Sequence, residues 1–374
     1  MSGEREVGTT GAESTNLDQW RELACRRGNA FLLPEWFACW NRVYGDEGGE
    51  PAIAGETAAD GSLRGLMPFV RTGHCLRFAG ASLGDRFGPV AGVGDEDRVA
   101  AAAAAAFDRR DYLVLDHVDR GASWPGAIEA ESGRRLKRVT TRYDVLPSIE
   151  LDGLDWDGFL RGRSRNFRSQ IRSKERRLAR DHELDYRRTT RPEDLDRDMD
   201  AFFRLHDARW TDRGGSSIAT ERARRFHREF AAALLELGWL RLWFLELDGE
   251  AVAVWYGWNV GGRYAYYLAG LDPDWHQLSV GFVLLAHTVR EAIAEGARDY
   301  DLLRGSESYK DRFASDRREV ETIVLAPSRS RALAVARLEA MAWRRSRNMP
   351  AGLRAAGSGL YRRAGRLMPT ARRR

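Results

Sequence analysis

Four charged side chains lie in and just after the segment 300–303, where they could carry out proton transfer and anion binding. They are Asp301, Arg304, Glu307 and Lys310. The segment predicts a strand, and polar residues at the point where a chain leaves a sheet often converge on one cleft. Asp301 or Glu307 could accept a proton from an amine. Arg304 or Lys310 could orient an anionic group. The alternative is an ion pair between Asp301 and Arg304 that only fixes a loop.

The segment before these residues has the pattern of a sheet followed by a helix. Residues 240–271 alternate between polar and apolar types and are interrupted at Asp248-Gly249 and Gly261-Gly262, which suit tight turns. This pattern predicts three antiparallel strands. From Val280 apolar residues recur at helical spacing, and Gly296 suits a left-handed C-terminal cap. The N–H groups at the start of this helix would lie beside a sheet edge, where an anion can bind.

A third group of candidates lies on a predicted helix over residues 192–214. His206 and Trp210 are four residues apart and therefore share one helix face. They could form a wall for an acceptor molecule, or they could be a core histidine and a packed tryptophan. The candidates for acceptor binding are His206, Trp210, Arg213, Tyr267 of the predicted sheet and Tyr309 beyond its last strand.

Length and composition limit the class of protein. A chain of 374 residues with 43% hydrophobic residues exceeds the size at which one core usually keeps growing, so we expect two domains. The longest apolar run, residues 99–107, is too short to span a bilayer, and the polar start favours a cytoplasmic protein. Three cysteines and seven scattered histidines indicate neither a disulfide framework nor a metal site. The motifs of serine hydrolases, P-loop kinases and dinucleotide-binding folds are missing from the sequence.

The basic residues are concentrated at the C-terminal end. The chain has a net charge of +5, but residues 328–374 contain thirteen arginines and one acidic residue, Glu339. Arg331–Arg347 predicts an amphipathic helix, and the remainder is rich in Gly, Ala and Arg. Such a tail suits an anionic membrane surface or nucleic acid, and would place the protein at the inner face of a membrane. A solvated, solubilising tail is the alternative.

A second basic stretch covers residues 161–180 and predicts a helix with few apolar positions. Arg165, Arg168 and Arg172 could share one face and hold phosphates. The alternative is a solvated helix that links two domains.

The two halves of the chain show a faint internal repeat. In the first half the segment 76–80, a loop with Asp85, an alanine-rich helix over 96–107 and a strand over 111–115 follow one another. The same order recurs later as 268–270, a loop, a helix and 299–303. Similar intervals between the parts favour a duplicated α/β unit over two unrelated domains.

Several short segments together resemble the CelD/FemAB-type branch of the GNAT acyltransferases. They are NAFLLPEW at 29–36, Gly80 with Asp85, SRNFR at 164–168, LHDARW at 205–210, RG at 213–214, YYLAGLD at 266–272, DLLRG at 301–305 and YK at 309–310. The resemblance covers residues 29–327. It implies an α/β protein with tandem, duplicated GNAT-like folds, each a mixed sheet flanked by helices. The expected division is a disordered start (1–16), a first domain (17–150), a catalytic second domain (151–327) and the basic tail (328–374).

The resemblance also implies a site for an acyl-thioester donor. The backbone N–H groups of residues 277–281 would hold the phosphates of an acyl-coenzyme A donor, and acetyl-coenzyme A is the donor that we expect. These residues are Gln277, Leu278, Ser279, Val280 and Gly281. GNAT enzymes commonly have Arg/Gln-x-x-Gly-x-Gly/Ala here, and this chain keeps only Gln277 and one glycine. An ordinary helix start capped by Ser279 is the alternative.

Together these features predict an N-acyltransferase that moves an acyl group from a thioester to an amine. The resemblance suggests that the amine belongs to a small molecule or a glycan, as in the synthesis of envelope polysaccharide. Two alternatives remain open: a Fem-like enzyme that uses aminoacyl-tRNA as its donor, and a non-catalytic binding module with a basic docking tail.

Overall fold

The computed structural model describes residues 14–133, 135–211, 215–216, 218–305 and 308–347 of the chain. The chain divides into two compact units. The first unit comprises residues up to Asp144 and from Glu319 onward, and the second unit is Val145–Arg318. Residues 319–327, which the sequence analysis assigns to the second domain, lie in the first unit because they pair there with the strand Tyr112–Asp119. Residues 14–16, expected to be disordered, begin the first helix, and residues 1–13 lie outside the described residues.

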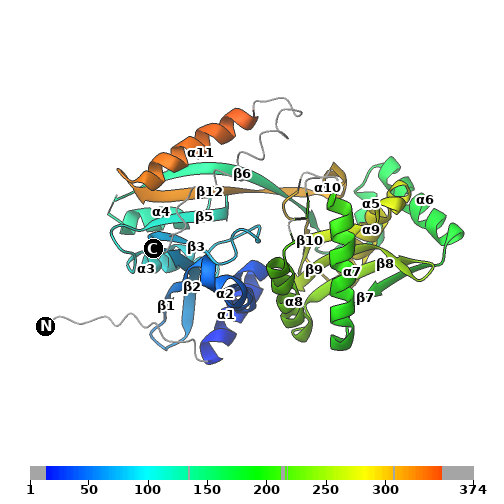
Figure 1. Cartoon of the computed structure of the whole chain (residues 1–374), viewed down its shortest axis with the longest axis horizontal. Helices are drawn as coiled ribbons and strands as arrows, with labels where there is room; N and C mark the ends of the chain where they lie inside the picture. The colour runs from blue at the N-terminus through cyan, green and yellow to red at the C-terminus, as the bar shows by residue number, and fades with distance from the viewer. Residues whose placement is uncertain (1–13, 134, 212–214, 217, 306–307, 348–374) are drawn as a thin grey trace. The chain divides into compact units, whose positions relative to one another are not determined.

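The first unit contains a mixed sheet with the strand order β1-β2-β3-β5-β12-β6, and β4 pairs with β2 (Figure 1). Its elements are α1 (Ser14–Arg27), η1 (Ala30–Leu32), α2 (Pro34–Gly48), β1 (Glu50–Thr57), β2 (Leu63–Thr72), β3 (Cys75–Phe78), β4 (Val90–Ala91), α3 (Glu96–Ala104), β5 (Tyr112–Asp119), α4 (Trp124–Glu131), β6 (Leu136–Glu150), β12 (Asp316–Pro327) and α11 (Arg331–Arg347). The last residues of β6 and the first residues of β12 belong to the second unit.

The second unit contains a sheet with the order β6-β11-β10-β9-β8-β7. Its elements are α5 (Trp156–Arg161), α6 (Arg165–Asp181), β7 (Leu184–Arg188), α7 (Pro192–Trp210), α8 (Glu221–Glu236), β8 (Leu240–Leu247), β9 (Glu250–Val260), β10 (Arg263–Leu271), η3 (Pro273–Leu278), α9 (Val280–Ala294), β11 (Asp299–Asp301) and α10 (Ser308–Phe313). The predicted meander is confirmed as β8, β9 and β10. Its turn residues Asp248, Gly249, Gly261 and Gly262 have positive φ angles of 54°, 82°, 57° and 74°.

A strand, a helix and a parallel strand recur in the two units, which confirms the α/β class and the duplicated unit. In the first unit β3 and β5 pair in parallel and α3 lies between them in sequence. In the second unit β10 and β11 pair in parallel and α9 lies between them in sequence. A parallel pair needs a crossover connection, and a helix supplies it in both cases.

Helices cover both faces of the sheet in the second unit. Neighbouring residues of a strand point to opposite faces of the sheet. The contacts of Trp255 and of Tyr256 on β9 therefore show which helices cover each face. Trp255 belongs to a buried cluster that includes Phe167 of α6 and Val283 of α9. The ring of Tyr256 lies 5.1 Å from the ring of Phe202 on α7. Thus α6 and α9 cover one face of the sheet and α7 covers the other.

The predicted helix Arg331–Arg347 is confirmed as α11. It buries Leu333 and Ala336 against Tyr112 of β5 and Val324 of β12 in the first unit. Residues 348–374, the rest of the predicted tail, lie outside the described residues. Among the helices described, none has the length and the apolar character needed to cross a membrane.

Replacing Gly257 by alanine should destabilise the second unit. An added Cβ at this position of β9 would fall on the carbonyl oxygen of Ala265 on β10, far inside van der Waals contact. The two central strands would have to move apart, which costs about 3 kcal/mol of unfolding free energy. The matched control is Gly162→Ala, whose Cβ would lie 3.5 Å from the Phe159 carbonyl oxygen. Urea unfolding of both variants measures the difference, and equal stabilities would contradict this account of β9 packing.

Candidate functional site

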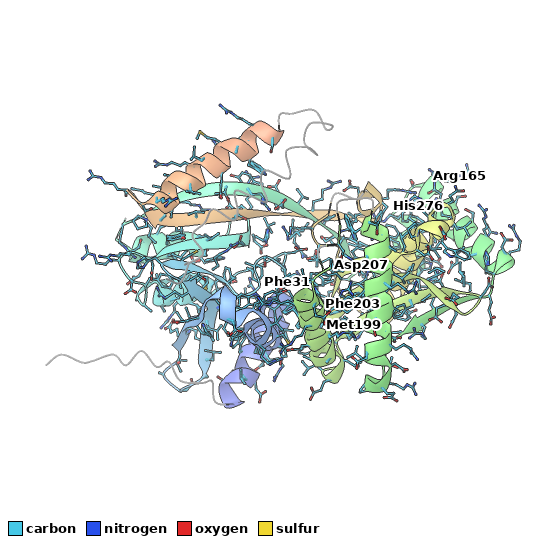
Figure 2. The ribbon with its side chains drawn as sticks, in the orientation of Figure 1. Phe31, Arg165, Met199, Phe203, Asp207 and His276 are labelled. Atoms are coloured by element: carbon cyan, nitrogen blue, oxygen red, sulfur yellow. The ribbon has the colours of Figure 1, made fainter. Side chains whose placement is uncertain are left out.

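The second unit contains a cavity of about 680 Å³ between α6, β10, the start of α9 and α10. Cavities of this size hold most small ligands and cofactors. Its lining residues are Gln170, Lys174, Ala208, Arg209, Val254, Trp255, Tyr266, Ala269, Gly270, Leu271, Pro273, His276, Ser279, Val280, Gly281, Phe282, Leu284, Leu285, Tyr309 and Arg312. His276, which Figure 2 labels, lies in η3 just before α9.

One wall of the cavity is the part of β10 that has parted from β11. The two strands pair only over Arg263–Ala265 of β10, after which β11 ends at Asp301. β10 continues to Leu271, and Tyr266, Ala269 and Gly270 of this continuation line the cavity. A β-strand that loses its neighbour presents unpaired backbone groups along that edge. An extended ligand with amide groups could therefore bind alongside it.

A second wall is the N-terminal end of α9. The helix follows Ser279, which has a left-handed conformation with φ 59°, and Ser279, Val280 and Gly281 line the cavity. The first N–H groups of a helix lack acceptors within the helix and favour an anion. Lys174 Nζ of α6 donates a hydrogen bond of 2.8 Å to Ser279 Oγ, which brings a positive charge to the same place.

Only part of the expected donor loop faces this space. Ser279, Val280 and Gly281 line the cavity, as the sequence analysis expects for a donor site. Gln277 is exposed and is not a lining residue. Leu278 packs against the hydrophobic core of the unit.

The charges that line the cavity are positive. Lys174, Arg209 and Arg312 are lining residues, and no aspartate or glutamate is found among the lining residues that the structure describes. Arg312 Nη2 donates a hydrogen bond of 2.8 Å to Gln170 Oε1, and its guanidinium lies 5.1 Å from the ring centre of Phe282. The cavity therefore suits an anionic ligand.

A cluster of two tyrosines, an arginine and a lysine lies beside β10. The hydroxyl oxygens of Tyr266 and Tyr309 are 2.8 Å apart and share a hydrogen bond. Arg209 of α7 donates to the Ala269 carbonyl oxygen at 3.3 Å and to Tyr309 Oη at 3.5 Å. The ammonium of Lys310 lies 5.0 Å from the ring centre of Tyr266.

The guanidinium of Arg209 stays charged in this cluster. Burial disfavours its charge, but the neighbouring oxygens of Tyr266 and Tyr309 outweigh burial and raise the pKa of Arg209. A fixed cation beside two hydroxyl groups stabilises negative charge that develops on either oxygen or on a ligand next to them.

The charged residues predicted around the end of β11 do not all reach the cavity. The carboxylate of Asp301 is buried, accepts the Leu303 N–H at 2.9 Å and lies 3.5 Å from Arg318. Lys310 is also buried, and its Nζ donates to the Arg304 carbonyl oxygen at 3.0 Å. Asp301, Arg304 and Lys310 are not lining residues, whereas Tyr309 is. Glu307 lies outside the described residues.

The predicted acceptor residues on α7 belong mainly to the core. His206 is buried against the ring of Phe202, and its Nδ1 lies 2.9 Å from Ser216 Oγ, which confirms the core interpretation. The ring of Trp210 lies 6.2 Å from that of His206. Tyr267 packs against Trp258 with ring centres 4.9 Å apart. These three side chains do not line the cavity, and Arg213 lies outside the described residues.

Several lining residues are not among the predicted site residues, and Lys174, Arg209 and Arg312 are the most informative of them. In α6 the sequence left open whether Arg165, Arg168 and Arg172 hold phosphates or belong to a solvated face. Arg168 instead donates to the Arg163 carbonyl oxygen at 2.7 Å. Residues that flank a buried helical stripe lie beside the core, and Gln170 and Lys174 flank the stripe Phe167, Ile171 and Leu178. That signal was present in the sequence.

The middle of the chain has a recognisable family signature. Residues 165–311 match the family model described as acetyltransferase (GNAT) domain. This segment, which is less than half of the chain, is therefore similar to the acetyltransferase (GNAT) domain. It includes α6, β10, α9 and Tyr309, the parts that surround the cavity. Comparison with curated proteins gives no match.

Solved structures share the fold over most of the chain. FemX aligns with a TM-score of 0.61 and 12% identity, over 87% of this chain and 98% of FemX. The C-terminal domain of a putative lysylphosphatidylglycerol synthetase from Agrobacterium fabrum aligns with a TM-score of 0.55 and 12% identity, over 87% and 95%. A conserved protein of unknown function from Bacteroides thetaiotaomicron gives 0.53 and 11%, over 84% and 99%. At such identities these likenesses show the fold alone, and they bear out tandem GNAT-like folds.

Two buried histidines next to this site make stability depend on pH. Burial lowers the pKa of His206 to about 4, and the nearby charge of Arg209 adds to this effect. Burial, together with His206, lowers the pKa of His227 to about 3. The unfolded chain protonates both imidazoles near pH 6.5, whereas the folded chain resists protonation until much lower pH. The unfolding free energy should therefore fall as the pH falls from about 6.5 toward 4.

The substitution His227→Phe should remove part of this dependence. Phenylalanine keeps an aromatic ring in the site but cannot bind a proton, so the loss of unfolding free energy between pH 7 and pH 4.5 should shrink by about 2 kcal/mol. The control is Tyr267→Phe, which changes a ring 5.7 Å from His227 without removing an imidazole. Urea unfolding at several pH values gives both slopes. Parallel slopes for the wild type and His227→Phe would show that this histidine does not contribute.

Proposed function

We propose that the second unit transfers an acyl group from an acyl-thioester, with acetyl-coenzyme A as the simplest donor, to an amine. The observation that carries this proposal is the cavity itself. It joins the open edge of β10 to the N-terminal end of α9, and it is lined by cations without a carboxylate among the described lining residues. Acyl-coenzyme A has amide groups in its pantetheine arm, which suit a strand edge, and a pyrophosphate, which suits a helix N-terminus.

The donor would lie with its extended arm along β10 and its phosphates at α9. The N–H groups that follow Ser279 and the ammonium of Lys174 would hold the pyrophosphate. Arg312 of α10, which donates a hydrogen bond to Gln170 of α6, would hold a further phosphate. This arrangement uses Ser279, Val280 and Gly281 of the predicted loop and does not need Gln277.

The reaction needs a group that protonates the leaving sulfur. As the amine nitrogen attacks the thioester carbon, the C–N bond forms, the C–S bond breaks, and the thiolate takes up a proton. Tyr309 lines the cavity, and Tyr266 is hydrogen-bonded to it, so the Tyr309 hydroxyl can donate that proton and recover one through Tyr266. Arg209 would stabilise the negative charge on the tyrosine oxygen until reprotonation.

The amine must also lose a proton. Glu307 is the predicted base that remains, since Asp301 is held by the Leu303 N–H and by Arg318. Glu307 precedes Tyr309, the proposed acid, by two residues in the sequence, and we propose that it accepts this proton. We propose a small-molecule or glycan amine, as in envelope polysaccharide synthesis, as the acceptor.

An aminoacyl-tRNA donor is the second candidate. The exposed arginines of α6 favour this donor. Arg165, which Figure 2 labels, Arg172 and Arg176 are exposed on one side of the helix. The other side of the helix carries Gln170 and Lys174, which line the cavity. FemX and the lysylphosphatidylglycerol synthetase domain have the same fold, and the name of the latter refers to an aminoacyl lipid. A non-catalytic binding module on this fold is the third interpretation, and it predicts no turnover with either donor.

Coenzyme A or acetyl-coenzyme A should raise the melting temperature of the purified protein, because a ligand that binds only the native state stabilises it. Lys174→Met should weaken this binding about tenfold by removing a charged group from the phosphate site. The matched control is Arg176→Met on the outward side of the same helix, which should bind like the wild type. Calorimetric titration gives the dissociation constants.

The thermal shift and titrations with charged tRNA separate the two donors. No thermal shift at saturating coenzyme A would reject the thioester donor. Binding of charged tRNA that weakens in Arg165→Met, Arg172→Met and Arg176→Met would then support the second candidate, because those side chains would contact the nucleic acid backbone.

Tyr309→Phe should lower kcat by about 10²-fold to 10⁴-fold with little change in donor affinity, because it removes the proton donor and keeps the ring. Release of the free thiol of coenzyme A in the presence of an amine measures the rate. The control is Tyr186→Phe, which removes a hydroxyl that bonds Glu175 on α6, away from the cavity lining. A Tyr309→Phe enzyme as fast as the wild type would assign the proton to another group.

A further inference from the structure

The helix α11 has an exposed face that combines arginine with large apolar side chains. Arg331, Leu338 and Arg345 follow at intervals of seven residues, so they lie along one line of the helix. Leu338 is 62% exposed, and Met341, on the same side, is 51% exposed. Leu338 and Met341 therefore form a small exposed apolar patch that an apolar partner could cover.

The opposite face of α11 is already occupied. Leu333, Ala336 and Ala340 are buried, and Leu333 and Ala336 pack against the sheet of the first unit. The helix lies along β6 and β12 of that unit (Figure 1). Its outward face is therefore not needed for the packing of the helix on the sheet.

The outward face also carries no acidic group. Glu339 is the one carboxylate between residues 328 and 374. It is partly buried, burial raises its pKa, and Arg142 of β6 and Arg77 of β3 are close enough to oppose this increase. The outward face is thus positive and apolar, and in the sequence beyond Arg347 seven more arginines follow without an acidic residue.

We propose that α11 docks on an anionic lipid bilayer through Arg331, Leu338, Met341 and Arg345. Arginine alone would suit either phospholipid headgroups or nucleic acid, because both present phosphates. The apolar side chains of Leu338 and Met341, which lie between the two arginines, favour a lipid surface over nucleic acid. They can enter the boundary between headgroups and acyl chains, whereas the outside of a duplex offers them no apolar surface.

The proposed docking has two components, as stable attachment of a peripheral protein usually requires. The arginines supply attraction to the anionic surface, which weakens with salt. Leu338 and Met341 supply apolar burial, which salt does not screen. The proposal concerns the first unit and does not depend on the reaction proposed for the second.

The test is co-sedimentation of the full-length protein with vesicles. One set contains equal parts of phosphatidylglycerol and phosphatidylcholine, and the other contains phosphatidylcholine alone. We expect binding to the first set and little binding to the second. The double variant Leu338→Asn/Met341→Asn, which keeps every charge, should bind the anionic vesicles about tenfold more weakly, because it removes the apolar burial.

A matched control is Val93→Asn, which removes an apolar side chain that is 92% exposed in the turn before α3. It should bind like the wild type. Urea unfolding checks that the double variant is folded, as expected for two exposed positions. If the folded double variant binds anionic vesicles as tightly as the wild type, the proposal is overturned. The binding would then come from the electrostatic attraction of the arginines alone. Binding to duplex DNA or RNA without binding to anionic vesicles would overturn it as well.

Discussion

The place where β10 and β11 part determines what the second unit can bind. The two strands pair over three residues, and β10 then continues for six more with β9 as its neighbour on one side and no described strand on the other. A sheet that stayed paired would fill this space with backbone hydrogen bonds. The parting leaves a strand edge, and the crossover helix α9 begins next to it, so that one cavity has a hydrogen-bonding wall and a helix N-terminus.

The electrostatics of this cavity follow from which helices border it. Lys174 and Gln170 come from α6, Arg209 from α7 and Arg312 from the end of α10. The buried guanidinium of Arg209 stays charged because the hydroxyl groups of Tyr266 and Tyr309 surround it. In the proposed reaction this cluster would stabilise negative charge, donate a proton and recover one. Positive charge without a carboxylate among the described lining residues explains why a phosphate-bearing donor fits better than a cationic one.

Local patterns predicted the elements of the fold well but the site only in part. The alternation of β8 to β10 and the helical spacing of α9 and α11 could be read directly, and the structure has them at these positions. Of the predicted site residues, Ser279 to Gly281 and Tyr309 line the cavity, and they border predicted elements. Asp301 was also plausible, yet its carboxylate faces Arg318 and the Leu303 N–H. Which neighbour a polar side chain meets depends on residues that are distant in sequence.

The sequence by itself determined the α/β class, the duplicated unit and the basic C-terminal segment, because periodicity, turn residues and charge are local properties of the chain. Only the tertiary structure decided that β12 joins the sheet of the first unit, that Lys174 meets Ser279 and that Arg209 meets Tyr309. Lys174 and Ser279 are 105 residues apart in the sequence, and Arg209 and Tyr309 are 100 residues apart. Their contact is set by how helices pack on the two faces of a sheet, and no local pattern encodes that distance.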